Sequence, residues 1–176
     1  MIACQPAILL AMALTASLMA GCRQNNQTQS AKAPLPAPSG ERTALEQSIS
    51  AWTSGDKAGA VTQFLQIDWT KGKPFSTGSV LHYSEAEFAA LPPGTRTKLD
   101  EKMGDITALK ELCKQVGQQG RDAAAKGDKA EAAKYFNAIN QCGERLDRPD
   151  CLVLLQQVGK ALKKLAAKEV EAGAGK

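Results

Sequence analysis

Five cysteines and one histidine are the side chains of this chain best suited to act as nucleophiles or to bind a metal ion. A single histidine cannot supply a metal site built from several histidines, and no Cys-x-x-Cys pair is present to form a thioredoxin-like redox site. The sequence also lacks a complete phosphate-binding glycine loop, a Gly-x-Ser-x-Gly nucleophile turn and a His-Glu-x-x-His motif. We therefore expect no catalytic residues, no metal ion and no dissociable cofactor, and we do not expect an enzyme.

The densest group of side chains suited to recognition lies between residues 64 and 88. This stretch holds five of the eight aromatic residues and the only histidine, and much of it is rich in turn-forming residues. Long irregular segments of compact domains are often functional, but each aromatic ring could instead pack the segment onto alanine-rich helices. If the segment binds a ligand, the candidate surface consists of Trp69, Lys71, Lys73, His82 and Tyr83.

The beginning of the chain has the properties of an export signal. Residues 1–21 carry no charged side chain, and residues 7–21 are apolar or small throughout. This apolar run is shorter than the roughly 20 residues that a membrane-spanning helix needs. An ordinary cleavable signal and a short buried helix are the alternatives that the composition leaves open.

The sequence Leu-Met-Ala-Gly-Cys at residues 18–22 resembles the lipobox of bacterial lipoproteins. The resemblance implies that a signal peptide, residues 1–21, is removed and that Cys22 carries a covalent lipid, which would anchor the protein to a membrane. Two or three acyl chains make such an anchor effectively permanent. The residue after the cysteine is Arg23, which by the sorting rule of enterobacterial lipoproteins implies the periplasmic face of the outer membrane rather than the inner membrane.

Residues 22–40 are predicted to be the lipidated cysteine and a flexible, disordered tether. They are rich first in Gln, Asn and Ser and then in Pro and Ala, without apolar periodicity. The remaining residues, 41–176, are enough for one domain. Few aromatic residues and many alanines and leucines favour closely packed helices over a β-sandwich or barrel.

A repeated motif supports this helical interpretation. Gly-Asp-Lys-Ala-x-Ala-x-x-x-Phe occurs at residues 55–64 and again at residues 127–136. The glycine can adopt the left-handed conformation that ends one helix, the aspartate can cap the next helix, and alanine allows close approach of the two backbones. The motif resembles the turn and second helix of the tetratricopeptide repeat, in a degenerate form. Two unrelated helical hairpins that use the same turn chemistry are the alternative, and both interpretations predict antiparallel helices.

We therefore predict an all-α fold, a small bundle of antiparallel helical hairpins. The expected order is a hairpin at residues 41–67, an irregular aromatic-rich segment at 68–94, a three-helix region at 95–170 and a frayed tail at 171–176. A capping box at Ser84 and Glu87 should open a short helix within the irregular segment, and Pro92-Pro93-Gly94 should stop it. The third long helix should begin near Pro149.

If Cys22 is lipidated as the resemblance implies, three cysteines remain and at most one bridge can form within the chain. Cys113 and Cys142 should lie level across the second hairpin, whereas Cys142 and Cys151 flank the turn that follows it. Both pairings are feasible. We favour Cys142–Cys151, because a cysteine near the start of a helix can meet one in the last turns of the preceding helix with little distortion. A third possibility is that all three are reduced and packed as small hydrophobic residues.

The net charge of +4 is too small to suggest a nucleic-acid partner. Four lysines, Lys160, Lys163, Lys164 and Lys168, lie largely off the apolar face of the last helix, where they could form a solvated face or contact anionic lipid or cell-wall polymer.

These features together predict a lipid-anchored helical module that binds or scaffolds another protein in the cell envelope. One alternative is a small-ligand binder or enzyme that uses the aromatic loop around His82. The other is a structural protein that binds cell-wall polymer or lipid through its basic last helix.

Overall fold

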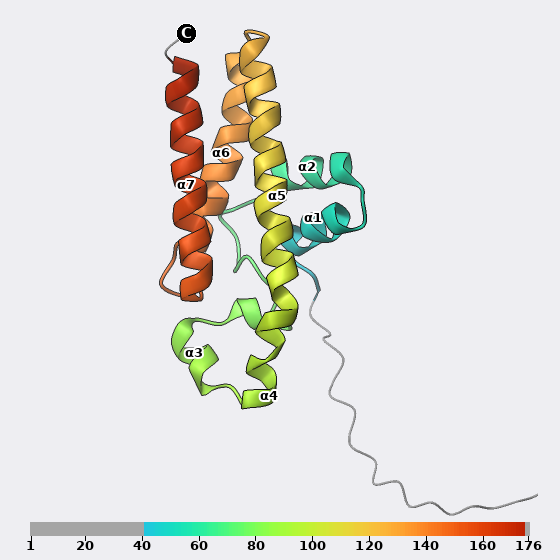
Figure 1. Cartoon of the computed structure of the whole chain (residues 1–176), viewed down its shortest axis with the longest axis vertical. Helices are drawn as coiled ribbons and strands as arrows, with labels where there is room; N and C mark the ends of the chain where they lie inside the picture. The colour runs from blue at the N-terminus through green and yellow to red at the C-terminus, as the bar shows by residue number, and fades with distance from the viewer. Residues whose placement is uncertain (1–40, 175–176) are drawn as a thin grey trace, which may run out of the picture. The chain divides into compact units, whose positions relative to one another are not determined.

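The computed structural model describes residues 41–174, so the lipobox, the tether and the last two residues lie outside the described part of the chain. Residues 41–174 form helices joined by turns and loops, without a strand, which confirms the predicted all-α bundle (Figure 1). The elements in chain order are α1 (Ala44–Thr53), α2 (Lys57–Leu65), a short 3-10 helix η1 (Val80–His82), α3 (Glu85–Ala90), α4 (Pro93–Arg96), α5 (Lys98–Ala125), α6 (Lys129–Leu146) and α7 (Val153–Ala174).

The three long helices α5, α6 and α7 pack against one another, and the α1–α2 hairpin packs on α5 (Figure 1). Their facing sides form one apolar core, because apolar residues recur every three to four positions along each helix. The most deeply buried members of the core include Leu109, Leu112 and Val116 of α5, Ile139 and Leu146 of α6, Leu155 of α7 and Phe64 of α2.

Glycines allow α6 and α7 to approach closely. A Cβ atom added at Gly159 would lie 2.5 Å from the carbonyl oxygen of Gly143 and 2.6 Å from the backbone nitrogen of Asp147. Such distances are shorter than any real van der Waals contact, so the two backbones can meet here only without side chains. Asp147, at the end of α6, then forms ion pairs with Lys163 of α7 at 2.7 Å and Lys160 at 3.9 Å.

Both helical hairpins turn with the predicted chemistry. Gly55 and Gly127 have positive φ angles of 96° and 83°, a conformation that glycine adopts without steric cost. The side chain of Asp56 accepts a hydrogen bond from the N–H of Gly59, and Asp128 accepts one from the N–H of Glu131, so each aspartate caps the second helix of its hairpin.

The segment between the hairpins contains more regular structure than predicted. Residues 67–79 form turns and bends, and the capping box of Ser84 and Glu87 begins α3 as predicted. α3 ends at Ala90, before Pro92-Pro93-Gly94, as predicted, but Pro93 has a second role. It starts the one-turn helix α4, because proline is well suited to the first helical position.

The boundaries of two long helices also differ from the prediction. α7 begins at Val153 rather than near Pro149, because the chain first turns with the Cys151 N–H donating to the Arg148 carbonyl. The N–H of Val153 then donates to Glu85 of α3 at 3.1 Å. At its other end α7 continues through Ala174, so the first four residues of the predicted frayed tail are helical.

Of the helices between residues 41 and 174, none combines the length and apolar character that crossing a bilayer requires.

Candidate functional site

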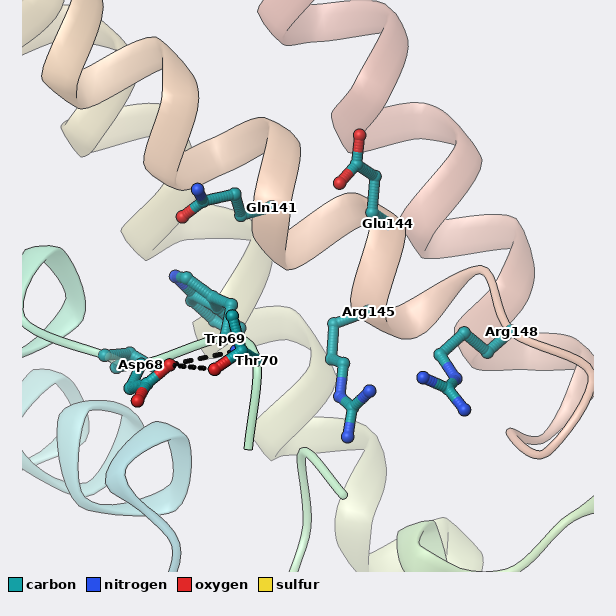
Figure 2. A pocket seen from close by; sticks show the side chains of 8 residues that line it. Asp68, Trp69, Thr70, Gln141, Glu144, Arg145 and Arg148 are labelled. Carbon is teal, nitrogen blue, oxygen red and sulfur yellow. Dashed lines mark hydrogen bonds between the residues drawn. The ribbon is translucent and has the colours of Figure 1, made fainter. Parts of the chain in front are cut away.

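Two adjoining cavities meet at Trp69 and Arg145. One has a volume of 380 Å³ and lies between residues 67–70 and the end of α6 (Figure 2), and the other has a volume of 310 Å³ and lies between residues 67–74 and the start of α1. The two cavities share four lining residues, Ile67, Asp68, Trp69 and Arg145. We call the combined depression the Trp69 groove.

Trp69 is held in the groove by the core beneath it. Its ring packs edge to face against Phe64, with 5.3 Å between ring centroids, and Phe64 is fully buried. Trp69 itself is half-buried and lines both cavities. Edge-to-face aromatic pairs fix ring orientation, so the exposed part of the indole is a pre-formed surface of the groove.

Asp68 is ionised and already neutralised within its own loop. One carboxylate oxygen accepts hydrogen bonds from the N–H of Thr70 at 3.1 Å and from its hydroxyl at 2.6 Å, and the other pairs with Lys71 Nζ at 2.9 Å. The hydrogen bonds from Thr70, followed by the contact with Lys71, lower the pKa of Asp68 from 3.8 to about 2.

Of the four basic side chains that line the groove, only Arg145 has no carboxylate partner within residues 41–174. In the described part of the chain its guanidinium forms no ion pair and no hydrogen bond, although it lines both cavities. The neighbouring Arg148 instead donates to Asp150 at 3.0 Å, and Glu144 accepts a hydrogen bond from Asn140 at 2.8 Å. Arg145 is therefore the groove's available site for a negatively charged group.

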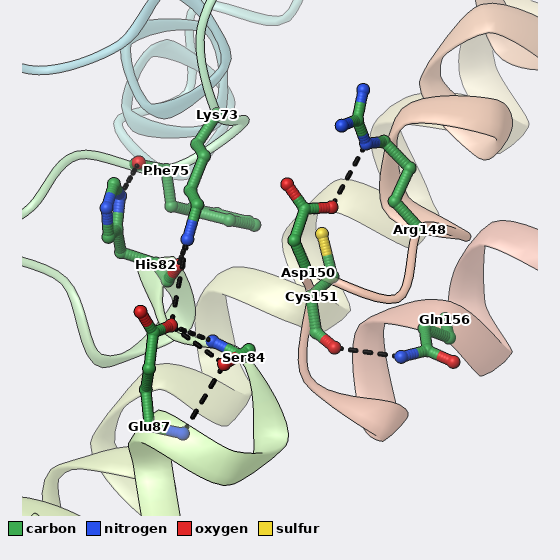
Figure 3. Close-up of polar contacts among 9 residues, drawn as sticks. All are labelled: Lys73, Phe75, His82, Ser84, Glu87, Arg148, Asp150, Cys151 and Gln156. Carbon is green, nitrogen blue, oxygen red and sulfur yellow. Dashed lines mark hydrogen bonds and ion pairs between the residues drawn. The ribbon is translucent and has the colours of Figure 1, made fainter.

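The candidate surface predicted from the sequence is divided in the structure. Trp69, Lys71 and Lys73 line the groove, whereas His82 and Tyr83 do not line either of its cavities. Nδ1 of His82 lies 2.7 Å from the carbonyl oxygen of Phe75 (Figure 3), and because a carbonyl can only accept, Nδ1 carries the hydrogen. The His82 and Tyr83 rings pack edge to face at 6.0 Å.

Lys73 lines the groove and also contacts the segment that holds His82 and Tyr83. Its ammonium donates to the carbonyl oxygen of His82 at 3.0 Å and lies 3.8 Å from Glu87 (Figure 3). The pKa of Glu87 is lowered, first by hydrogen bonds from the backbone and side chain of Ser84 and then by Lys73 and His82. These contacts hold residues 73–75 against His82 and against Glu87 of α3. His82 therefore has a role in the fold.

Two of the three cysteines among residues 41–174 form a close pair. Gly117 faces Ile139 and Gly120 faces Phe136 across α5 and α6, and this antiparallel register sets Cys113 against Cys142. Both are fully buried, and burial, followed by a hydrogen bond with Cys113, raises the pKa of Cys142. The thiol of Cys151 makes a different contact, with its sulfur 3.7 Å from the carbonyl oxygen of Arg145.

All three cysteines are free thiols in the structure. The structure brings together the second of the two pairings considered from the sequence, Cys113–Cys142, through a hydrogen bond between their side chains. The Cys142–Cys151 pairing that we favour from the sequence stays a prediction.

Two of the four lysines on the basic face of α7 form ion pairs within the domain. Lys160 and Lys163 pair with Asp147, whereas Lys164 and Lys168 are exposed and have no ion pair within residues 41–172. This leaves two of the four lysines free to meet an anionic surface.

The groove offers charged, aromatic and hydrogen-bonding groups. Neither cavity is lined by histidine or cysteine, and residues 41–174 contain no group of three His, Cys, Asp or Glu side chains that could hold a metal ion. The groups that the groove offers are the planar guanidinium of Arg145, the aromatic surface of Trp69 and hydrogen-bonding groups at the rim. Together they suit recognition of a polar partner.

Four groove residues were not predicted from the sequence: Gln141, Glu144 and Arg145 at the end of α6, and Arg148 just after it. The spacing of three and four residues places the first three on one helical face, but only the packing of residues 67–74 turns that face into a groove.

Comparison with known proteins yields no significant match to a protein family, a curated protein or a solved structure.

Proposed function

We propose that this chain is an exported, lipid-anchored helical module that binds or scaffolds another protein in the cell envelope, with the Trp69 groove as its binding face. The observation that carries the proposal is Arg145, which has no ion pair among residues 41–174, beside the half-buried Trp69 at the junction of two cavities. Tryptophan and arginine are the side chains that contribute most often to the energetic centres of protein interfaces.

The sequence before the described domain supports the proposed location. The lipobox-like residues 18–22 would attach lipid at Cys22, and the polar, proline-containing residues 23–40 would connect that anchor to the domain. Arg23 favours the periplasmic face of the outer membrane. The membrane is then reached through the lipid, which leaves the helical domain available for a protein partner.

A binding role fits the groove better than a catalytic one. Asp68 holds its negative charge through Thr70 and Lys71, and its lowered pKa makes it a poor proton acceptor near neutral pH. His82 is engaged with the Phe75 carbonyl and does not line the groove. The proposal therefore assigns this chain no reaction.

The proposal can be tested by placing a photoreactive amino acid at a single position of the full chain in its native envelope. Thr70 lies exposed at the edge of the groove, and Lys164 is an equally exposed control on α7. We expect a covalent protein adduct from position 70 and none from position 164. An adduct from position 164 alone would contradict the proposal and favour binding through the basic face of α7.

A further inference from the structure

We propose that the Trp69 groove takes an acidic protein segment, in which an Asp or Glu carboxylate pairs with Arg145 and a neighbouring apolar or aromatic side chain packs on Trp69. This inference rests on the proposed function of the groove as a protein-binding face. It adds the chemical class of the partner.

The smaller cavity is lined by more basic than acidic side chains, with Lys71, Lys73 and Arg145 against Asp68. Four basic side chains, Lys71, Lys73, Arg145 and Arg148, and two acidic ones, Asp68 and Glu144, line the two cavities. The partners of three of the basic side chains lie within the fold. Lys71 pairs with Asp68, Lys73 lies near Glu87, and Arg148 pairs with Asp150.

Arg145 is the remaining cation, and neither acid that lines the groove forms an ion pair with it; Glu144 lines only the larger cavity. Asp68 uses one oxygen for Thr70 and the other for Lys71, while Glu144 accepts from Asn140. The guanidinium is half-buried and lines both cavities. An incoming carboxylate can accept two parallel N–H bonds from a guanidinium, which gives charge complementarity together with a defined orientation.

The apolar part of the groove lies next to this charge. Trp69 and Ile67 line both cavities, and Leu45 and Pro74 line the smaller one. Both volumes are at the lower end of the range of small-molecule pockets, so each suits a few side chains of a peptide rather than the face of a folded domain.

The groove is already formed without a partner. The hydroxyl of Thr43 donates to the Pro74 carbonyl at 2.7 Å, and Lys73 donates to the His82 carbonyl at 3.0 Å, so residues 67–74 are fastened at their far end. Trp69 is fixed against Phe64. A pre-formed site loses little conformational freedom on binding, which favours measurable affinity from a small contact area.

A discrete carboxylate suits the groove better than a polyanion does. The carboxylate of Glu144 lines the larger cavity together with Arg145 and has no cationic partner among residues 41–174, so it would repel the closely spaced phosphates of nucleic acid or of an anionic lipid surface. A segment with one or two acidic residues among apolar ones avoids this repulsion.

Selection from random peptides displayed on phage tests the inference. The target is the mature chain from residue 22, with Cys22→Ser to keep it free of lipid, compared with the same chain carrying Arg145→Glu. The matched control is Arg96→Glu on α4, which makes the same charge change at an exposed position outside the groove. We expect the parent and Arg96→Glu to enrich peptides with Asp or Glu beside an aromatic or large apolar residue. Arg145→Glu should bind those peptides ~10-fold more weakly or worse.

Enrichment of basic or purely apolar peptides on the parent would overturn the inference, and so would equal affinity for the parent and Arg145→Glu. Binding of the parent to anionic vesicles that is lost in Arg145→Glu, without peptide enrichment, would assign the groove to lipid instead. Equal thermal unfolding midpoints of the three proteins ensure that a loss of binding is local. If position 70 gives a protein adduct in the envelope but the selected peptides are not acidic, the proposed function stands and only this partner chemistry is wrong.

Discussion

Arg145 and Asp68 line the same two cavities but have opposite surroundings. Asp68 is satisfied by its own loop, whereas Arg145 has no carboxylate among the described residues. The difference arises from position in the chain. Asp68 precedes Thr70 and Lys71 in a tight turn, while Arg145 projects from the last turn of α6, where the neighbouring acids have nearer partners.

The local partners of Asp68 make a prediction about its titration. Replacing Thr70 by Ala removes the hydroxyl donor that contributes most to the lowered pKa, so the pKa of Asp68 should rise from about 2 toward 3.8. Because the folded state holds the lower pKa, Asp68 contributes stability at pH values above 3.8, and this contribution is lost as the pH falls toward 2. Carboxyl carbon chemical shifts followed by NMR report the midpoint.

Thr62→Ala is the matched control for this titration, since the Thr62 hydroxyl donates to the Ala58 carbonyl within α2 and does not contact Asp68. An Asp68 midpoint that stays the same in Thr70→Ala would show that the turn does not hold the carboxylate as described.

The facing positions of Cys113 and Cys142 predict which thiols join when the folded protein is incubated with oxidised glutathione. Exchange would transfer two electrons from the two thiols to the glutathione disulfide, giving one protein disulfide and two glutathione thiols. Peptide mapping without reduction should find Cys113–Cys142 and a free Cys151. The reaction should be slow, because both thiols are buried and the pKa of Cys142 is raised. A Cys142–Cys151 bridge with a free Cys113 would contradict the predicted pairing of Cys113 with Cys142.

The contact between α6 and α7 depends on backbone approach at two glycines. Gly159→Ala would place a methyl group 2.5 Å from the Gly143 carbonyl oxygen, so we expect the free energy of unfolding to fall by about 1–3 kcal/mol. Gly104→Ala is the control, because Gly104 lies in α5 with open space around its Cβ position and alanine there should raise stability by about 0.5–1 kcal/mol. Urea denaturation measures both changes, and a Gly159→Ala protein as stable as the parent would contradict the close packing.

Local chemistry determined which elements could be predicted from the sequence. The turns at Gly55 and Gly127, and the capping box that opens α3, depend on residues within four positions of one another, and all three have the predicted form. The errors are at places where local signals compete. α3 ends before Pro92-Pro93 as predicted, but Pro93 also starts α4, which was not predicted, and the start of α7 depends on the turn at Cys151 and on Glu85 from α3.

The groove is formed by segments far apart in the chain, so only three of its lining residues could be predicted from the sequence. Trp69, Lys71 and Lys73 were singled out because aromatic and basic residues cluster in one irregular segment. Arg145 is separated from Trp69 by 76 positions, and only tertiary packing brings the two together. His82 and Tyr83 share the segment with Trp69 but turn to other contacts.

The proposed anchor gives a prediction for the complete protein. The mature parent should have a mass larger than that of residues 22–176 by the lipid on Cys22. Cys22→Ser should remove both the lipid and the cleavage that depends on it. Mass spectrometry of the protein recovered from membranes of its host measures this difference. A parent whose mass corresponds to an unmodified chain would contradict lipid anchoring.

The central claim is that the Trp69 groove, with Arg145 at its centre, is the face through which this chain binds a protein partner. It is tested most directly by the yield of the photoadduct from position 70 in the native envelope, compared between the parent, Arg145→Glu and the control Arg96→Glu. The account predicts a specific adduct in the parent and in Arg96→Glu, reduced ~10-fold in Arg145→Glu. An adduct of equal yield in all three proteins, or no adduct in the parent, would contradict it.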